Sequence, residues 1–405
     1  MKKLLLLGGS AQQVKAIVTA KKMGYYTVLC DYLSDNPGQY EADKFYLVST
    51  TDKGACLKVA IEENVDGIVA YSSDPAAPTA AYVAEKLHLP GIPYKIAEAF
   101  CEKYLFREFL MKHHFHVPAS RELTEESTVT DLQGLHFPII VKPTDSSGSK
   151  GVMVLPQMGE FEEAKKFALQ FSRNGILIAE EFIERDHPDV IEAELFVING
   201  KVQVCGLMNA IRDPYTNPLL PAAYSYPLNI GEKRVKLVRR EISRLVEASG
   251  VSYGAFNIEM IIDKSDRLYF LDAGPRNGGN QLPEFIGGIA DEDMVKTTLL
   301  AAMGEYDAIK DVLLDGVSGG YWGLSVIHTD HLGIFKGIAY DTLARKYLLH
   351  DSYLMELGQK ASTFRLSRDA LALSFYKFPD RSIQDEILRD FKGEHVQAVV
   401  EKCLV

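Results

Sequence analysis

The sequence predicts an α/β protein with more than one domain, and three observations support this. Over the first 95 residues, short apolar runs alternate with segments of helical periodicity. From about residue 118 a different pattern begins, in which short strands flank a loop rich in glycine and serine. The chain has 405 residues, and at roughly 100–200 residues per domain this length suggests two or three domains.

Residues 1–95 are predicted to form an open, mostly parallel sheet of Rossmann-like type. Strands separated by helices of about 10–15 residues imply parallel pairing with right-handed crossovers. The expected strands are 4–7, 27–30, 45–48 and 67–71, and the expected helices are 11–23, 53–63 and 76–87. Gly8-Gly9-Ser10 follows the first strand, but the Gly-x-Gly-x-x-Gly pattern of a dinucleotide site is absent. We therefore do not expect NAD.

The rest of the chain is predicted to contain strands, hairpins and three helices, at 97–114, 160–171 and 235–249. A single helix is expected over 97–114, with Lys103 and Arg107 four residues apart on one face. Asn199-Gly200 predicts a hairpin turn between strands 191–198 and 201–207. Residues 212–227 hold four prolines and three tyrosines, which favours a substrate loop over a core element. Residues 316–405 are expected to form a small α+β region.

Composition and charge exclude several classes of function. The chain has 44 Lys plus Arg against 55 Asp plus Glu, a net charge of −11, so we expect neither nucleic-acid nor membrane-surface binding. No apolar run approaches the roughly 18 residues that span a bilayer. The five cysteines are scattered without a Cys-x-x-Cys pair, which favours free thiols and a cytoplasmic location.

The loop Asp145–Gly151 is a candidate phosphate-binding loop. Its glycines and serines allow backbone N–H groups to converge on one point, as in known anion cradles. Lys142 precedes the loop and Lys150 lies in it, and lysine binds phosphate as a point charge. The alternative is a flexible hairpin turn with solvated lysines, because the Walker spacing is absent.

Glu259 and Asp272 are candidate metal ligands. Each lies in an apolar strand, and a short polar turn joins the two strands. A carboxylate inside an apolar strand is costly unless a cation compensates its charge. Two carboxylates on adjacent antiparallel strands could hold one Mg²⁺, which prefers oxygen ligands. The alternative is that each faces solvent. Asp272 also opens Asp272-Ala273-Gly274-Pro275-Arg276, in which Arg276 could grip a carboxylate or phosphate.

This ordered set of motifs resembles the ATP-grasp superfamily over essentially the whole chain. The resemblance is to carboxylate–amine ligases and their relatives, namely phosphoribosylamine–glycine ligase, biotin carboxylase and carbamoyl-phosphate synthase large chains. It implies a Rossmann-like pre-ATP-grasp domain at 1–95, an ATP-grasp domain at 96–315 with a lid subdomain at about 118–185, and a C-terminal α+β domain at 316–405. It also implies ATP and Mg²⁺ (or Mn²⁺) as cofactors.

The resemblance assigns roles residue by residue. Nucleotide binding would fall to the phosphate lysines, the lid loop and the adenine-binding hinge, which are Lys103, Lys142, Ser146, Ser147, Gly148, Ser149, Lys150, Gly151, Glu180, Glu181, Phe182 and Ile183. Asp189, or alternatively Glu184, would hold the ribose. Glu259 and Asp272 would bind Mg²⁺, and Arg276 with Lys142 would act in catalysis. We expect the acceptor site between the N-terminal sheet and Arg276, with Arg276, Arg212, Tyr224, Asn280 and Gln281 contributing.

The implied reaction is an ATP-dependent ligation of a small carboxylate to an amine through an acyl phosphate. One departure from the family bears on the metal. The usual Glu-x-Asn-x-Arg stretch is here Asp272-Ala273-Gly274-Pro275-Arg276, so a second metal ion is in doubt, with Asn277 or Asn280 as substitutes. The alternatives are a bicarbonate-phosphorylating carboxylase and a non-catalytic nucleotide-binding member. Expected partners are the small-molecule carboxylate and amine, and a homodimer is possible.

Overall fold

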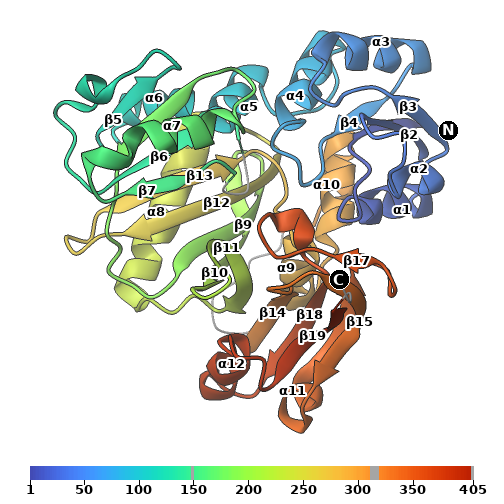
Figure 1. Cartoon of the computed structure of the whole chain (residues 1–405). Coiled ribbons are helices and arrows are strands. Elements are labelled where there is room, and N and C mark those ends of the chain that lie inside the picture. Colours follow the sequence, from blue (N-terminus) through green and yellow to red (C-terminus); the bar gives the residue numbers. More distant parts are fainter. Residues whose placement is uncertain (147–149, 311–318, 403–405) are drawn as a thin grey trace.

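A computed structural model describes residues 1–146, 150–310 and 319–402 (Figure 1). These residues form four β-sheets with helices packed against them, so the predicted α/β class is confirmed. In the described ranges no helix combines the length and apolar character that crossing a membrane requires. Cys30, Cys56, Cys101 and Cys205 are free thiols.

The N-terminal sheet is parallel, in the order β3-β2-β1-β4. Its strands are β1 (Lys3–Leu7), β2 (Tyr26–Asp31), β3 (Lys44–Leu47) and β4 (Gly67–Val69). The helices between and after them are α1 (Val14–Lys22), α2 (Gly38–Glu41), α3 (Lys53–Glu63) and α4 (Ala77–Lys86). The strand–helix alternation predicted from the sequence is therefore present.

The two faces of this sheet are covered by helices from different parts of the chain. Side chains of α3 and α4 pack on one face. On the other face, α1 packs together with α10 (Met294–Ala302), whose Val295 and Leu299 contact the core formed by Leu4 and Leu6. Figure 1 shows α10 running beside β4. A helix from outside residues 1–95 thus completes the N-terminal core.

The single helix predicted over 97–114 is wrong, because the chain forms two helices. These are α5 (Tyr94–Cys101) and α6 (Lys103–Lys112), which meet at Glu102. Glu102 is extended, with φ −115° and ψ 112°. The N–H of Lys103 donates to the carbonyl of Thr144 at 2.9 Å, so α6 begins where the chain meets the next sheet.

The sheet in the predicted lid subdomain, here named the lid sheet, is antiparallel, in the order β5-β8-β6-β7. Its strands are β5 (Ser120–Leu123), β6 (Ile139–Pro143), β7 (Met153–Leu155) and β8 (Leu177–Glu181). Helix α7 (Phe161–Leu169) packs on one face through Phe161 and Ala164. The Gly/Ser loop joins β6 to β7, as predicted.

The largest sheet has eight antiparallel strands, in the order β13-β12-β9-β10-β11-β14-β18-β16. They are β9 (Val190–Ile198), β10 (Lys201–Asp213), β11 (Asn217–Tyr226), β12 (Gly254–Ile262), β13 (Leu268–Gly274), β14 (Tyr321–Ile327), β16 (Leu348–Tyr353) and β18 (Ala372–Phe378). Helix α8 (Glu232–Ser249) covers one face at β9, β12 and β13.

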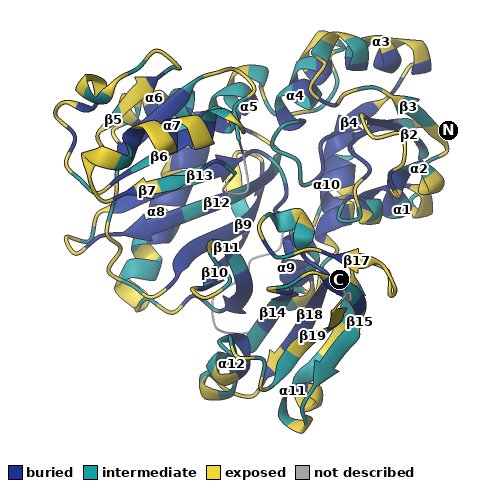
Figure 2. Cartoon of the chain, viewed as in Figure 1, coloured by how far each residue is buried: buried dark blue, intermediate teal, exposed yellow. Residues whose placement is uncertain are grey.

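Side-chain alternation divides this sheet into an apolar face and a polar face. Along β9, Ile191, Ala193 and Leu195 pack with α8. Since successive side chains of a strand point to opposite faces, Glu192 and Glu194 lie on the face away from α8. Figure 2 shows the dense burial of these central strands.

The prediction that residues 212–227 form a loop is wrong, because most of them form β11, which pairs with β10. Tyr224 and Tyr226 are buried in the sheet. Proline is tolerated here because the pairing is irregular: Pro221 lies opposite Arg212, between two register shifts of β10.

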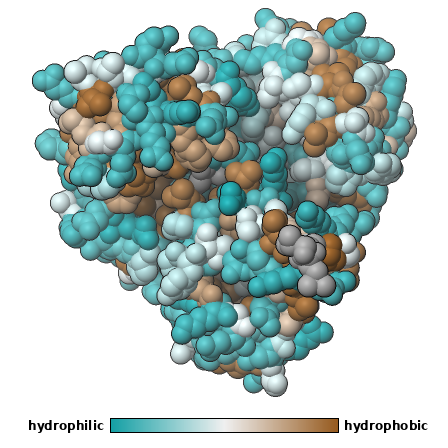
Figure 3. All heavy atoms as spheres, in the orientation of Figure 1, coloured by the Kyte–Doolittle hydropathy of each residue, from teal (hydrophilic) through white to brown (hydrophobic). Residues whose placement is uncertain are grey.

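The C-terminal residues extend the eight-stranded sheet and add a three-stranded one. The small sheet has the order β17-β15-β19. Its strands are β15 (Gly333–Tyr340), β17 (Lys360–Ala361) and β19 (Val396–Lys402). The remaining helices are α9 (Leu282–Ala290), α11 (Thr342–Tyr347), α12 (Arg381–Leu388) and the 3₁₀ turns η1 (Val129–Leu132), η2 (Met158–Glu160), η3 (Tyr306–Ala308) and η4 (Ser367–Asp369). Figure 3 shows the surface hollowed where the N-terminal, lid and C-terminal parts meet.

Candidate functional site

Glu259 and Asp272 lie directly opposite each other on β12 and β13. The pairing shifts between Glu259 and Met260, because Met260 pairs with Phe270 and Glu259 pairs with Asp272. Leu271 is thus an extra residue, a β-bulge. The bulge places Asp272 on the same face as Glu259, and bulges commonly re-aim side chains next to active sites. The expectation that the two carboxylates share adjacent antiparallel strands is correct.

A third carboxylate continues this row on the next strand. Glu192 of β9 pairs in register with Glu259. It is buried, and its Oε2 accepts no hydrogen bond within the residues that the structure covers. Burial, and then repulsion from Glu259, raise the pKa of Glu192 well above its ordinary value. Its Oε1 accepts a hydrogen bond of 2.6 Å from Asn257, which acts against this rise in pKa.

Glu194 anchors the loop that follows β13. Its Oε2 accepts a hydrogen bond from the N–H of Gly278 at 2.9 Å, and its Oε1 accepts one from Asn277 at 3.4 Å. Burial raises the pKa of Glu194 to about 8, against the opposing effect of these hydrogen bonds and of Arg276. The carboxyl group therefore positions the Gly-rich loop beside the acidic row.

Lys142 and Arg107 share one buried carboxylate, Glu180. The Arg107 Nε donates to Glu180 Oε1 at 2.5 Å, and Lys142 forms an ion pair with Glu180 Oε2. Burial alone would raise the pKa of Glu180, but Arg107 and Lys142 outweigh it and lower that pKa to about 2. Burial lowers the pKa of Lys142, which Glu180 opposes. The trio joins α6, β6 and β8 at the base of the lid.

Lys103 contacts the N-terminal end of the Gly/Ser loop. Its Nζ donates to the carbonyl of Ser146 at 2.5 Å. The Ser146 hydroxyl donates to the carbonyl of Lys150 at 2.8 Å, which brings the two ends of the loop together. Gly151 has φ +72°, and a Cβ there would approach Pro143 to 2.9 Å, so glycine is required. Ser147, Gly148 and Ser149 lie outside the described residues.

A cavity of about 460 Å³ lies between the N-terminal sheet, the lid and the end of β13. Its wall includes Lys103, Ser146, Asp272 and Asp74. It therefore brings a candidate phosphate lysine, the candidate lid loop and one candidate metal ligand to a single space. Asp74, from the loop after β4, was not predicted.

Arg276 is held by the N-terminal part of the chain. Its Nη2 lies 2.6 Å from both Oδ1 and Oδ2 of Asp74. Its Nη1 donates to Asn257 Oδ1 at 3.1 Å and to the carbonyl of Asn277 at 3.0 Å. Burial acts to lower the pKa of Arg276, but Asp74 outweighs it and raises that pKa. Arg276 thus carries a structural ion pair in addition to any contact with substrate.

Gly274 stands where the family pattern has asparagine, and the structure explains the difference. A Cβ at position 274 would lie 2.6 Å from Arg276 Cζ and 2.6 Å from Asp74 Oδ1. Real Cβ atoms do not approach that closely, so the ion pair fills the space that a side chain would need.

The residues predicted to form the adenine hinge, Glu180–Ile183, begin at the end of β8 and continue beyond it. Glu181 accepts hydrogen bonds from the backbone and ring of His136 at 2.9 and 2.7 Å. The N–H of Phe182 donates to the carbonyl of Pro138 at 2.9 Å. Ile183 packs against the core of the large sheet. These contacts fix the path of the hinge backbone.

The two ribose candidates have different surroundings. Asp189 is buried and forms a bidentate ion pair with Arg389, at 3.0 and 2.5 Å. Glu184 is exposed and pairs with Lys264 at 2.9 Å. Asp189 therefore ties β9 to the end of α12, and a contact with ribose would compete with that tie.

The candidate substrate residues surround the acidic row. Arg212 Nη2 lies 3.3 Å from Glu259 Oε2. The Asn280 amide donates to the Tyr224 hydroxyl at 3.2 Å, and the N–H of Asn280 donates to Gln12 at 2.7 Å. Gln281 instead donates to Ser352 at 2.7 Å and so contacts the C-terminal part.

Sequence reasoning missed Glu192, Glu194, Asp74 and the role of Arg107. Glu192 and Glu194 carried the signal used for Glu259, a carboxylate inside an apolar strand. Asp74 follows a parallel strand, and ligands of open α/β sheets bind at the carboxyl ends of strands. The salt bridge between Arg107 and Glu180 joins residues 73 positions apart, so no local pattern marks it.

The donor set fits a hard divalent cation. Glu259 and Asp272 present carboxylate oxygens on one face, as Mg²⁺ prefers. In the part of the chain that is described, no group of three or more His, Cys, Asp or Glu side chains is placed to hold a metal ion. Two protein carboxylates leave the other positions of an octahedral ion to phosphate oxygens and water, as is usual for Mg²⁺.

Comparisons with known proteins agree with this geometry. The sequence model of the family described as "Carbamoyl-phosphate synthase L chain, ATP binding domain" matches residues 102–305. The formate-dependent phosphoribosylglycinamide formyltransferase of Bacteroides thetaiotaomicron is 24% identical over 291 residues, covering 68% of this chain and 71% of that protein.

Two solved structures have a similar fold. The L-amino acid ligase from Bacillus licheniformis has a TM-score of 0.76 at 19% identity and covers 99% of both chains. The biotin carboxylase domain of the 2-oxoglutarate carboxylase from Hydrogenobacter thermophilus, solved with MgADP, ADP and bicarbonate, has a TM-score of 0.72 at 17% identity. The match covers 99% of this chain and 91% of that domain.

Proposed function

This chain belongs to the carbamoyl-phosphate synthase L chain ATP-binding family, and from that premise we propose that it phosphorylates a small carboxylate with ATP and joins it to an amine. The family has the ATP-grasp fold, so the resemblance seen in the sequence is confirmed. The chain is an enzyme of the ligase class that forms C–N bonds.

The observation that carries this proposal is that acidic and basic side chains lie around the same cavity. Asp272, opposite Glu259, shares the wall of the 460 Å³ cavity with Lys103 and Ser146. Metal-binding carboxylates supply sites for a cation that bridges phosphates, and lysines neutralise phosphate charge. That combination suits transfer of a phosphoryl group, where catalysis is mostly positioning and electrostatic stabilisation.

The proposed reaction has two steps. A carboxylate oxygen attacks the γ-phosphorus of ATP, the bond to the β,γ-bridging oxygen breaks, and ADP leaves. The amine nitrogen then attacks the acyl carbon, phosphate leaves with the former carboxylate oxygen, and the amine loses a proton. When bound at Glu259 and Asp272, Mg²⁺ would neutralise charge on the transferring phosphoryl group.

The chain's own residues have four tasks in this scheme. Lys103 and Lys142 bind the phosphates, with Glu180 orienting Lys142. The loop Asp145–Gly151 shields the acyl phosphate from water. The backbone at Glu180–Ile183 contacts adenine, and Asp189 or Glu184 contacts the ribose. Arg276 contacts the donor carboxylate or the acyl phosphate.

Isotope transfer tests this function most sharply. The protein would be incubated with MgATP and a panel of ¹⁸O-labelled carboxylates, including formate, acetate, glycine and bicarbonate, with and without amines. Carboxylate-dependent ADP release with one ¹⁸O atom in the phosphate is the expected result. Dependence on bicarbonate alone would favour the carboxylase alternative. ADP release that no acid stimulates, with unlabelled phosphate, would overturn the proposal.

Three finer expectations belong to the same proposal. Mn²⁺ should replace Mg²⁺, because it accepts the same oxygen ligands. The free thiols of Cys30, Cys56, Cys101 and Cys205 suit a reducing cytoplasm. Light scattering would show whether the chain forms a homodimer.

A further inference from the structure

Both terminal nitrogens of the Arg276 guanidinium are already engaged by other groups of the protein. Nη2 is engaged by Asp74, at 2.6 Å to both carboxylate oxygens. Nη1 is shared between Asn257 Oδ1 and the carbonyl of Asn277. Nε is buried, and its N–H donates to no partner among the described residues. A residue expected to hold a negatively charged substrate therefore already holds a negatively charged side chain.

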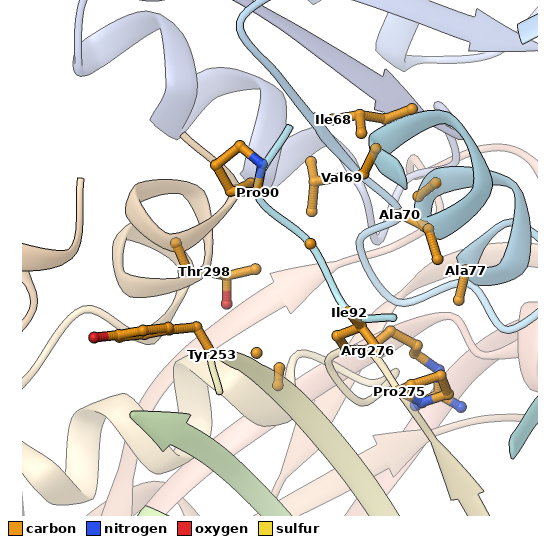
Figure 4. A pocket seen from close by; sticks show the side chains of 18 of the residues that line it. Ile68, Val69, Ala70, Ala77, Pro90, Ile92, Tyr253, Pro275, Arg276 and Thr298 are labelled. Carbon is orange, nitrogen blue, oxygen red and sulfur yellow. The ribbon is translucent and has the colours of Figure 1, made fainter. Parts of the chain in front are cut away.

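Neighbouring residues pack closely against one side of the Asp74–Arg276 ion pair. Gly274 lies against it, because a Cβ there would meet Arg276 Cζ and Asp74 Oδ1 at 2.6 Å each. A second, mainly apolar cavity of about 90 Å³ borders Arg276. Figure 4 shows Arg276 and Pro275 across this cavity from Thr298 and Tyr253. The walls of this cavity are mostly alanine, isoleucine and other apolar residues, and they include no charged side chain other than Arg276.

The other side of the pair borders the reaction space. Asp74 lines the 460 Å³ cavity together with Lys103 and Asp272. A guanidinium released by Asp74 would therefore face the same cavity as the candidate phosphate lysine and metal ligand. Asp74 comes from the loop after β4 and Arg276 from the loop after β13, so the pair also joins two separate parts of the chain.

We propose that Asp74 is a gate residue, whose carboxylate occupies Arg276 in the unliganded enzyme and releases it when the substrate carboxylate or acyl phosphate arrives. This inference rests on the proposed function, because it assumes an anionic substrate at Arg276. It adds a residue from the loop after β4 to the reaction, as a positioning residue that acts through Arg276.

The proposal predicts the direction in which the affinity of Arg276 for anions changes when Asp74 loses its charge. A hydrogen-bonded Asp–Arg pair must be separated before an anion can bind, so part of the binding energy of the substrate offsets that cost. Asp74→Asn keeps the shape of the side chain and removes its charge. It should therefore increase the apparent affinity of Arg276 for small anions, which is the opposite of what loss of a substrate ligand would do.

Chemical modification tests this claim without using turnover. Phenylglyoxal reacts with free guanidinium groups, and peptide mass spectrometry would follow its reaction at Arg276. Wild type, Asp74→Asn and a matched control, Asp35→Asn on the same domain surface, would be compared. The probes would be acetate and inorganic phosphate. We expect Arg276 to react at least fivefold faster in Asp74→Asn, with half-protection by a probe at an at least fivefold lower concentration than in wild type.

Gly274→Ala is a second variant that should separate Arg276 from Asp74. Its Cβ would displace the pair while leaving both charged residues in place, so it should also speed the reaction of Arg276. If neither variant folds, the test uses the wild type. Acetate or phosphate should then shift the NMR resonance of the Arg276 Nε–H. Faster modification without protection by either probe, or no shift in the wild type, would overturn the gate. Wild-type ADP release that no carboxylate stimulates would instead count against the proposed function.

Discussion

Asp272 lies opposite Glu259 because Leu271 is bulged out of the pairing between β12 and β13. In a regular pairing without the bulge, Leu271 would pair with Glu259, and Asp272 would point to the face that α8 covers. One bulge thus decides whether the two carboxylates can share a cation. Glu192, in register on β9, extends the row, so three acids from three strands lie side by side.

Changing Glu259 to Gln should abolish ATP turnover, with a loss of at least 100-fold, and leave the fold intact. The substitution keeps the side-chain volume but removes a charged metal ligand. Coupled-enzyme measurement of ADP release and a thermal melt would check both parts. Glu62→Gln, an exposed substitution on α3, is the matched control. A Glu259→Gln enzyme with full activity would remove this residue from the metal site.

Changing Lys142 to Ala should weaken nucleotide binding by about tenfold or more, because a buried cation beside the lid loop is lost. Arg107 would still neutralise Glu180, so the fold should persist. Calorimetric titration with MgADP would measure the effect. Lys166→Ala on the exposed side of α7 should bind as wild type does. Equal affinities in the two variants would place Lys142 outside the nucleotide site.

Changing Glu180 to Gln should destabilise the protein by about 3–5 kcal/mol, because it leaves two buried cations without their counter-charge. The linkage has a definite sign. The pKa of Glu180 is lowered to about 2, so its contribution is present above the unfolded-state value near 4.5 and is lost as pH falls toward 2. Urea unfolding at pH 7 and at pH 3 would show a smaller difference between wild type and variant at pH 3. A constant difference would contradict the assignment.

Changing Glu194 to Gln should alter the pH dependence of stability in the opposite direction. The pKa of Glu194 is raised to about 8, so the folded state retains a proton that the unfolded state loses above about pH 4.5. Stability contributed by this group therefore falls as pH rises from about 4.5 to 8. The Gln variant should lack this fall and gain on wild type at pH 8. Parallel stability curves from pH 5 to 8 would contradict a buried neutral Glu194.

Changing Arg389 to Ala distinguishes a structural Asp189 from a ribose-binding one. Asp189 and Arg389 form a bidentate pair between β9 and the end of α12. Loss of Arg389 should lower stability by about 1–3 kcal/mol, because a buried carboxylate loses its partner. If Asp189 also binds ribose, the variant should bind ATP at least as tightly as wild type. Weaker ATP binding would show that the Asp189–Arg389 pair supports the nucleotide site only by stabilising the structure, and not through a contact of Asp189 with ribose.

Much of the fold follows from local patterns. The alternation of apolar strands and amphipathic helices in the first 95 residues predicts the parallel sheet, and Asn199-Gly200 predicts the hairpin of β9 and β10. The errors have physical causes. Glu102 interrupts a sequence with continuous helical periodicity, because the N–H of Lys103 donates to Thr144, which follows β6. Pro221 suggested a loop, yet an irregular pairing opposite Arg212 accommodates it.

The candidate site was predictable where it depends on residues inside strands, and not where it depends on distant partners. Glu259 and Asp272 stand out because a carboxylate in an apolar strand requires compensation. The Asp74–Arg276 pair joins residues 202 positions apart, and a local pattern cannot reveal it. The same pair explains Gly274, which appeared in the sequence only as a missing asparagine.

Titration of the protein with ADP, in excess Mg²⁺ and again in EDTA, tests most directly whether Glu259 and Asp272 hold the cation that binds the nucleotide phosphates. Wild type should bind ADP at least tenfold more tightly with Mg²⁺ than without it. The Glu259→Gln and Asp272→Asn variants should lose that difference while keeping metal-free affinity near wild type. If both variants retained the full Mg²⁺ enhancement, the two carboxylates would not be the metal site.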